Sequence, residues 1–139
     1  MKILFAADGS SFTKKALAFL VTHEALLAGG ELVVLNVQPA LPPQVRSFVG
    51  AGVVADYHRE EAEKVLAPIQ EFLHRHEIKY RSTFVVGQPG HEIVEASRRE
   101  GAHMIVMGTH GYGLLGRTVM GSVAQNVLVA SEVPVLLVK

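Results

Sequence analysis

Short, almost wholly apolar segments alternate along this chain with longer segments whose apolar residues recur every three or four positions. Short apolar segments of this kind are typical of buried β-strands. They predict strands at residues 2–7, 31–37, 78–86, 103–107 and 133–139. The segment at 78–86 alternates apolar and polar residues more than the others, so we expect it to form an edge strand.

The segments between these strands have the spacing of amphipathic helices. They predict helices at 11–28, at roughly 51–76, within 87–101, and from the end of a glycine-rich stretch to about Ala130. In the first helix, the apolar residues at helical spacing are Phe12, Ala16, Leu17, Leu20, Val21 and Leu27. Ser10 or Ser11 is expected to cap its N-terminus.

Glycine and proline residues predict where these elements end. Gly29 and Gly30 are expected to stop the first helix. Three prolines and two glycines in "QPALPPQVRSFVGAG" predict a loop at residues 38–52. Pro68 is expected to kink or break the second helix near Ala67.

The order of these elements predicts an α/β fold in one domain, residues 1–139. Strands that alternate with helices and are nearly all apolar form a parallel sheet covered on both faces. We therefore expect a three-layer, doubly wound, five-stranded parallel sheet with strand order 3-2-1-4-5. In such sheets, ligands bind outside the carboxyl ends of the strands where the winding reverses, here between strands 1 and 4. Asp8 ends strand 1 and Gly108 ends strand 4, so both are expected at that point.

The amino-acid composition argues against several classes of function. The chain has 13 basic and 13 acidic residues, and this balance argues against a non-specific nucleic-acid binder. It has no cysteine, which excludes disulfides, thiolate chemistry and zinc sites that need Cys. We expect no export signal, because the N-terminal apolar run is short, and no membrane span, because none of the runs approaches about 20 residues. The expected location is the cytoplasm.

The stretch "GTHGYGLLGRTVMGS" at 108–122 admits two phosphate-binding patterns. The first is the dinucleotide fingerprint G-x-G-x-x-G at Gly111, Gly113 and Gly116. That pattern needs an acidic residue about 20 positions later, at the end of the next strand, and the nearest acid, Glu132, precedes the strand. No G-K-[ST] follows for a Walker A loop, and the chain lacks the motifs of a kinase. An NAD-type site is therefore disfavoured.

The second pattern is G-x2-G-x9-G-S, formed by Gly108, Gly111, Gly121 and Ser122. The first two glycines allow backbone N–H groups to turn towards a phosphate. Gly121 and Ser122 fall at the start of the last helix, where free N–H groups and the helix dipole favour an anion. Arg117 is a candidate to add charge over the outer phosphates, with a solvent-facing side chain as the alternative.

The whole chain resembles a single-domain universal stress protein of the nucleotide-binding type. The resemblance lies in "ILFAADGS", "LVVLNV", "VGQPGHEIVEAS", "MIVMGTHG", "MGSVAQNVL" and "VPVLLVK". The spaced glycine pattern is the ATP-binding signature of that family, and it is complete here. The resemblance implies a Rossmann-like fold of the adenine nucleotide α hydrolase-like kind. It also implies a site for ATP, or for AMP or ADP, with Mg²⁺.

The resemblance also implies roles for individual residues. Asp8 matches an acid near the ribose and any bound metal, and the backbone of Val37 matches a contact to adenine. The other matching positions lie beside the nucleotide, in the following turn and at the phosphate-binding helix start: Met107, Gly108, His110, Gly111, Gly121, Ser122 and Val123. Ala7 is also expected at the site, on the pocket floor, where bulkier residues are common in the family. Asp8 has an alternative role as a helix cap or turn residue.

The seven histidines do not form a metal site by their spacing. His74 and His76 are two residues apart and do not share a helix face, and the others have no partner at ligand spacing. His110 is the one histidine that we expect beside the ligand.

The function we expect is an ATP-binding, nucleotide-dependent regulatory or stress-response module that acts on an unidentified protein partner. The alternatives are a slow Mg²⁺-dependent ATPase or phosphotransferase and a nucleotide-free interaction protein of the same fold. No catalytic residue is assigned, because no dedicated base is apparent near the γ-phosphate. The apolar edge strand at 133–139 is a liability unless it is paired, so we expect a homodimer through it.

Overall fold

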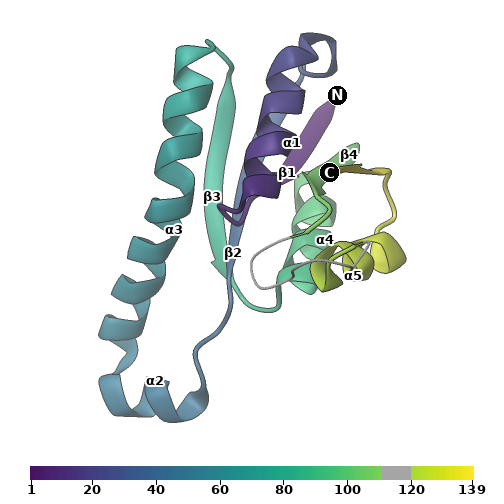
Figure 1. Cartoon of the computed structure of the whole chain (residues 1–139). Helices are drawn as coiled ribbons and strands as arrows, with labels where there is room; N and C mark the ends of the chain where they lie inside the picture. The colour runs from purple at the N-terminus through teal and green to yellow at the C-terminus, as the bar shows by residue number, and fades with distance from the viewer. Residues whose placement is uncertain (111–119) are drawn as a thin grey trace.

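A five-stranded parallel sheet with strand order β3-β2-β1-β4-β5 forms the centre of the protein in the computed structural model (Figure 1). The structure describes residues 1–110 and 120–139. The strands are β1 (Lys2–Ala6), β2 (Glu31–Gln38), β3 (Tyr80–Val86), β4 (Met104–Gly108) and β5 (Val135–Val138). The predicted fold class and strand order are confirmed, and β3 is an edge strand as expected. β4 begins and ends one residue later than predicted, and β5 is shorter than predicted.

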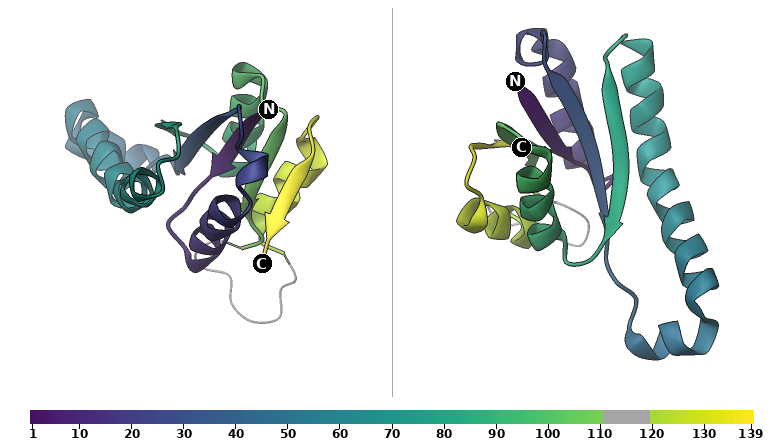
Figure 2. Two further views of the ribbon diagram at one scale, coloured as in Figure 1. Left: turned by 90° about the horizontal axis from the view of Figure 1, so that it is seen from above. Right: turned by 180° about the vertical axis from the view of Figure 1, so that it is seen from behind.

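Helices cover both faces of this sheet (Figure 2). They are α1 (Ser11–Thr22), α2 (Pro43–Val49), α3 (Ala51–Arg75), α4 (Pro89–Glu100) and α5 (Ser122–Ala130), with a short 3₁₀ helix η1 at Glu24–Leu26. α1 and α3 pack on one face, and α4 and α5 pack on the other. Neighbouring residues of β1 separate accordingly: Phe5 joins the first core and Leu4 the second. Both are fully buried, as expected for a strand covered on both sides.

α1 ends at Thr22, so the prediction of a helix to residue 28, stopped by two glycines, is wrong. Ser10 caps its start by accepting a hydrogen bond from the Thr13 N–H at 3.4 Å. At its end, the Thr22 hydroxyl and the His23 ring bond to carbonyls of the last turn. A 12-residue helix spans about 18 Å, which matches the length of the five-residue strand β1 beneath it. A helix continued to residue 28 would overrun the amino end of the sheet.

The predicted loop at 38–52 is wrong in part, because it contains α2. Pro43 occupies the first helical position, where its missing N–H costs nothing and its fixed φ favours the helix. The Arg46 N–H donates to the Pro42 carbonyl at 3.1 Å and closes the first turn. Gly50, with φ of 87°, joins α2 to α3. The two helices extend beyond the carboxyl end of the sheet (Figure 1).

α3 continues through Pro68, so the predicted break near Ala67 is wrong. Pro68 lies on the exposed side of the helix. Pro68 has no N–H to donate to the Lys64 carbonyl, and this carbonyl therefore lies on the side of the helix that water reaches. On the opposite side, Leu66, Ile69 and Leu73 are buried against the sheet and hold the helix together across the proline.

Four charged residues form an ion cluster at the amino end of the sheet, opposite the carboxyl ends of the strands. Lys2 lies 3.2 Å from Glu100 and 3.6 Å from Glu31, and Arg81 pairs with both carboxylates. The hydrogen bonds from Arg81, with help from Lys2, lower the pKa of the Glu100 carboxyl to about 2. The cluster joins β1, β2 and β3 to the end of α4. Among the described residues, no helix is long and apolar enough to cross a membrane.

Candidate functional site

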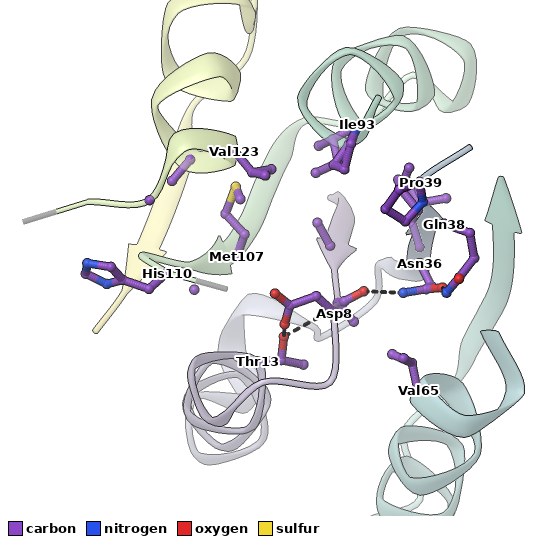
Figure 3. Close-up of a pocket in the computed structure, with 18 of the residues that line it drawn as sticks. Asp8, Thr13, Asn36, Gln38, Pro39, Val65, Ile93, Met107, His110 and Val123 are labelled. Atoms are coloured by element: carbon purple, nitrogen blue, oxygen red, sulfur yellow. Dashed lines mark hydrogen bonds between the residues drawn. The ribbon is translucent and has the colours of Figure 1, made fainter. Parts of the chain in front are cut away.

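A cavity of about 420 Å³ lies where the carboxyl ends of β1, β2 and β4 meet the starts of α4 and α5 (Figure 3). Every predicted binding residue that the structure describes lines it: Ala7, Asp8, Val37, Met107, Gly108, His110, Gly121, Ser122 and Val123. β1 and β4 are neighbours in the sheet, so the cavity lies at the reversal of the winding. Gly111 and Arg117 lie outside the described residues.

Asp8 follows β1 and is held by the turn that leads into α1. Its Oδ1 accepts hydrogen bonds from the Ser10 N–H at 2.9 Å and from the Thr13 hydroxyl at 2.8 Å. The same hydroxyl accepts from the Asp8 N–H at 3.1 Å. Asp8 thus has the turn role that the sequence allows, through one carboxylate oxygen. No described residue bonds to Oδ2, which remains available for a ligand.

The backbone of Val37 faces the cavity because β1 ends before β2 does. The Leu35 carbonyl points towards β1 and accepts from the Ala7 N–H at 2.8 Å, whereas the Gln38 carbonyl points towards β3 and accepts from Gly87. Backbone polar groups alternate in this way along a strand, so those of Val37 point to the side of β1. The ladder between β1 and β2 ends at the Ala6–Leu35 pair. Val37 therefore offers one donor and one acceptor beyond the end of β1.

Gly108 lies in close contact with α1. A Cβ added to Gly108 would lie 2.5 Å from the Cβ of Phe12 and 2.9 Å from its carbonyl carbon. Glycine is thus required here by the approach of β4 to α1, a reason that the glycine pattern alone does not reveal. Beyond it, the His110 ring lies over Phe12 with 4.8 Å between ring centroids, and its Nδ1 is 2.9 Å from the Thr109 hydroxyl.

The first turn of α5 borders the cavity, and the N–H groups of Ser122 and Val123 have no partner among the described residues. The Gly121 N–H donates to the Thr109 carbonyl at 2.7 Å, which ties this helix start to the end of β4. No side chain among the described residues caps α5, and its first turn carries no acidic residue. Ser122 and Val123 follow Gly121 and line the cavity. The combination of helix dipole, free N–H groups and the Ser122 hydroxyl suits an anion.

Sequence reasoning missed several residues of the cavity wall. These come from α1, β2, the following loop, α3 and α4: Thr13, Asn36, Gln38, Pro39, Glu61, Val65 and Ile93. Pro39, Val65, Ile93 and Met107 give the cavity an apolar wall, as small-molecule sites usually have. Nothing local in the sequence indicates that α3 reaches the cavity.

Two carboxylates, those of Asp8 and Glu61, line the cavity. Among the described residues, no group of three or more His, Cys, Asp or Glu side chains is arranged to hold a metal ion. Mg²⁺ that accompanies a nucleotide needs only one or two carboxylates, because phosphates and water complete its coordination. The free Oδ2 of Asp8 fits this requirement.

The comparisons with known proteins show the family of this chain and agree with its fold. The model of the universal stress protein family matches residues 1–139. This chain belongs to the universal stress protein family. The universal stress protein YxiE of Bacillus subtilis is 30% identical to it over an alignment of 146 positions, which covers 99% of this chain and 98% of YxiE.

Solved structures of universal stress proteins have the same fold. The structure of MJ0577 matches with a TM-score of 0.85 and 33% identity, over 99% of this chain and 94% of that one. MJ0577 is a universal stress protein of Methanocaldococcus jannaschii. The universal stress protein from Archaeoglobus fulgidus in complex with dAMP matches with a TM-score of 0.73 and 25% identity, over 100% of this chain and 98% of that one. Nucleotide binding therefore occurs among the structural relatives.

Proposed function

We propose that this chain binds ATP, or its products ADP and AMP, together with Mg²⁺, and acts as a nucleotide-dependent regulatory module in a cytoplasmic stress response. The observation that carries the proposal is the cavity itself. It is bordered by the start of α5, which no described side chain caps, by the backbone edge of Val37 and by the Asp8 carboxylate. An anion site, a pair of base-recognising groups and a carboxylate are the elements that a nucleotide requires. The dAMP complex of the Archaeoglobus fulgidus relative supports this choice of ligand.

The phosphates are assigned to the start of α5. Gly121, Ser122 and Val123 contribute backbone N–H groups there, and Ser122 adds its hydroxyl. Gly108 and His110 lie beside them on the β4 side of the cavity. The proposed phosphate contacts of Gly111 and Arg117 remain predictions.

The base is assigned to the apolar wall and the edge of β2. Adenine presents an amino donor beside a ring-nitrogen acceptor, which complements the carbonyl and N–H of Val37. Met107 and Ile93 would pack against its faces, and Ala7 and Asp8 would lie near the ribose. When bound with the nucleotide, Mg²⁺ would neutralise phosphate charge, and Asp8 would hold it through Oδ2 or a water molecule.

A regulatory module differs from the alternative, a slow ATPase or phosphotransferase, in its turnover. Hydrolysis requires a group that orients water and charge that stabilises the leaving group. Asp8 and Arg117 are the candidates, and the first is already engaged by Thr13 and Ser10. A multiple-turnover phosphate-release assay separates the two functions. Turnover of about 1 per second or faster would favour the enzyme.

The proposal includes a homodimer formed through β5. The N–H and C=O groups on one side of this strand pair with β4, and those on the other side face away from the sheet. On the neighbouring helix α5, Val129 is 89% exposed and Leu128 is 42% exposed. A second copy pairing across a two-fold axis would cover both the strand edge and these side chains.

Mass spectrometry of the nucleotide that remains bound through purification tests the proposed ligand. It does not require a choice among ATP, ADP and AMP beforehand. The proposal predicts that an adenine nucleotide is recovered, and its mass distinguishes ATP, ADP and AMP. Recovery of a different cofactor in stoichiometric amount would contradict it.

A further inference from the structure

Two neighbouring amide side chains on β2 form a short relay that begins at the end of β1. Asn36 is 2% exposed, and its Nδ2 donates to the Ala7 carbonyl at 2.8 Å. Its Oδ1 accepts from the Gln38 Nε2 at 2.6 Å. Asn36 and Gln38 both line the cavity, and Figure 3 shows the Gln38 side chain folded back towards Asn36.

The direction of this relay follows from its first member. The Ala7 carbonyl only accepts hydrogen bonds, so Asn36 must turn its NH₂ group towards it. The Asn36 Oδ1 then faces Gln38, which must donate to it from its own NH₂ group. The Gln38 Oε1 is what remains, and no described residue donates to it. The Ala7 carbonyl thus determines the orientation of both amides and leaves the Gln38 Oε1 as an acceptor for a ligand.

The wall near Gln38 offers two further acceptors together with one donor, the Val37 N–H. Glu61 reaches the same cavity from α3, and its carboxylate is 2.9 Å from the Lys64 ammonium. Val37 precedes Gln38 on β2, and its carbonyl points towards the space beyond the end of β1. A ligand group that meets the Gln38 Oε1 must therefore donate, whereas the adjacent Val37 N–H suits an acceptor on the ligand.

We infer that Gln38, held by Asn36, selects purines with a 6-amino group against purines with a 6-oxo group. This inference rests on the proposed function and adds a side chain to the recognition of the base. A 6-amino group donates to the Gln38 Oε1. A 6-oxo group would set one acceptor against another, and Gln38 cannot rotate its amide without breaking the bond to Asn36.

The test compares ATP with ITP, which carries a 6-oxo group, in calorimetric titrations of the full chain. Gln38→Met keeps the length of the side chain and removes its acceptor. We expect the wild-type preference for ATP over ITP to fall about tenfold in this variant, mainly through weaker ATP binding. Thermal unfolding of each protein shows that the comparison is made on folded chains.

Gln70→Met is the matched control. Gln70 lies on α3 and donates to the Ser82 hydroxyl at 2.7 Å, and it does not line the cavity. The same substitution there should leave the ratio of the ATP and ITP affinities unchanged. Binding of ATP with an unchanged ratio in Gln38→Met would overturn the inference alone. Failure of the wild-type chain to bind either nucleotide would overturn the proposed function, and the inference with it.

Discussion

Thr13 and Asp8 exchange two hydrogen bonds across the turn between β1 and α1. The Thr13 hydroxyl donates to the Asp8 Oδ1 at 2.8 Å and accepts from the Asp8 N–H at 3.1 Å. This arrangement fixes the carboxylate at the mouth of the cavity and leaves Oδ2 without a described partner. The turn and the binding roles of Asp8 are thus compatible, since each uses a different oxygen.

Asp8→Asn separates these two roles. An Asn side chain keeps an oxygen for the turn, so the free energy of unfolding should change by less than about 1 kcal/mol. The charge is lost, so the gain in ATP affinity on adding Mg²⁺ should disappear. Titrations with and without Mg²⁺ measure this gain, and a variant that retains it would show that Asp8 does not hold the metal.

Gly108→Ala should destabilise the protein by about 1–3 kcal/mol, because its Cβ would meet the Cβ and backbone of Phe12. Urea unfolding measures the loss. Gly52→Ala in α3 is the matched control, since a Cβ there meets nothing within 4 Å and alanine favours a helix. The control should be as stable as wild type or slightly more so. Equal effects of the two substitutions would refute the packing role of Gly108.

Glu100→Gln tests the ion cluster through its pH dependence. The pKa of Glu100 is lowered from 4.5 to about 2, so the carboxylate stabilises the fold above pH 4.5, and this contribution is lost as the pH falls towards 2. The partly exposed partners limit its size to about 1 kcal/mol. Urea unfolding should separate wild type from the variant at pH 7, and the difference should shrink by pH 3. A constant difference would contradict the assignment.

Leu137→Pro tests the proposed dimer. The Val138 carbonyl accepts from the N–H of Thr109, the residue after β4, so by alternation the N–H of Leu137 faces the open edge. Proline is tolerated at such a position of an edge strand but cannot donate to a second copy. Light scattering should report a dimer for wild type and a monomer for the variant. A dimeric variant that is folded by circular dichroism would place the interface elsewhere.

Ser122→Ala and Gly121→Val test the phosphate site. Loss of the Ser122 hydroxyl should weaken ATP binding about tenfold, and a valine at the helix start should weaken it further by blocking the backbone approach. Ser47→Ala removes a hydroxyl that bonds to the Pro43 carbonyl in α2, outside the cavity, and should leave the affinity unchanged. Wild-type affinity for ATP in both site variants would contradict the assignment of the phosphates to the start of α5.

The sheet was predictable because its strands are short apolar runs separated by amphipathic segments. The errors arose where tertiary contacts override local signals. α1 stops at Thr22 because the sheet beneath it ends, although the apolar spacing continues to Leu27. α3 passes Pro68 because the buried residues on its other side outweigh one lost hydrogen bond. Pro43 starts a helix in a stretch whose prolines and glycines favour a loop.

The candidate site was predictable where it follows strand ends and helix starts. Asp8 and Gly108 were found in this way, because the strand order brings the ends of their strands together. Ser122 was found from the glycine pattern at the start of the last helix. Asn36 and Gln38 were missed because an amide within a strand gives no local sign of its partner. The contact that orients Asn36 comes from Ala7, the residue after β1. The close approach of Phe12 to Gly108 likewise depends on how α1 packs, which spacing does not reveal.

The most direct measurement is a calorimetric titration of the purified, nucleotide-free chain with ATP in the presence of Mg²⁺. The cavity at the ends of β1, β2 and β4 predicts saturable binding of one nucleotide per chain. It also predicts weaker binding in Gly121→Val. No heat of binding at millimolar ATP would contradict the proposal that this universal stress protein is a nucleotide-binding module.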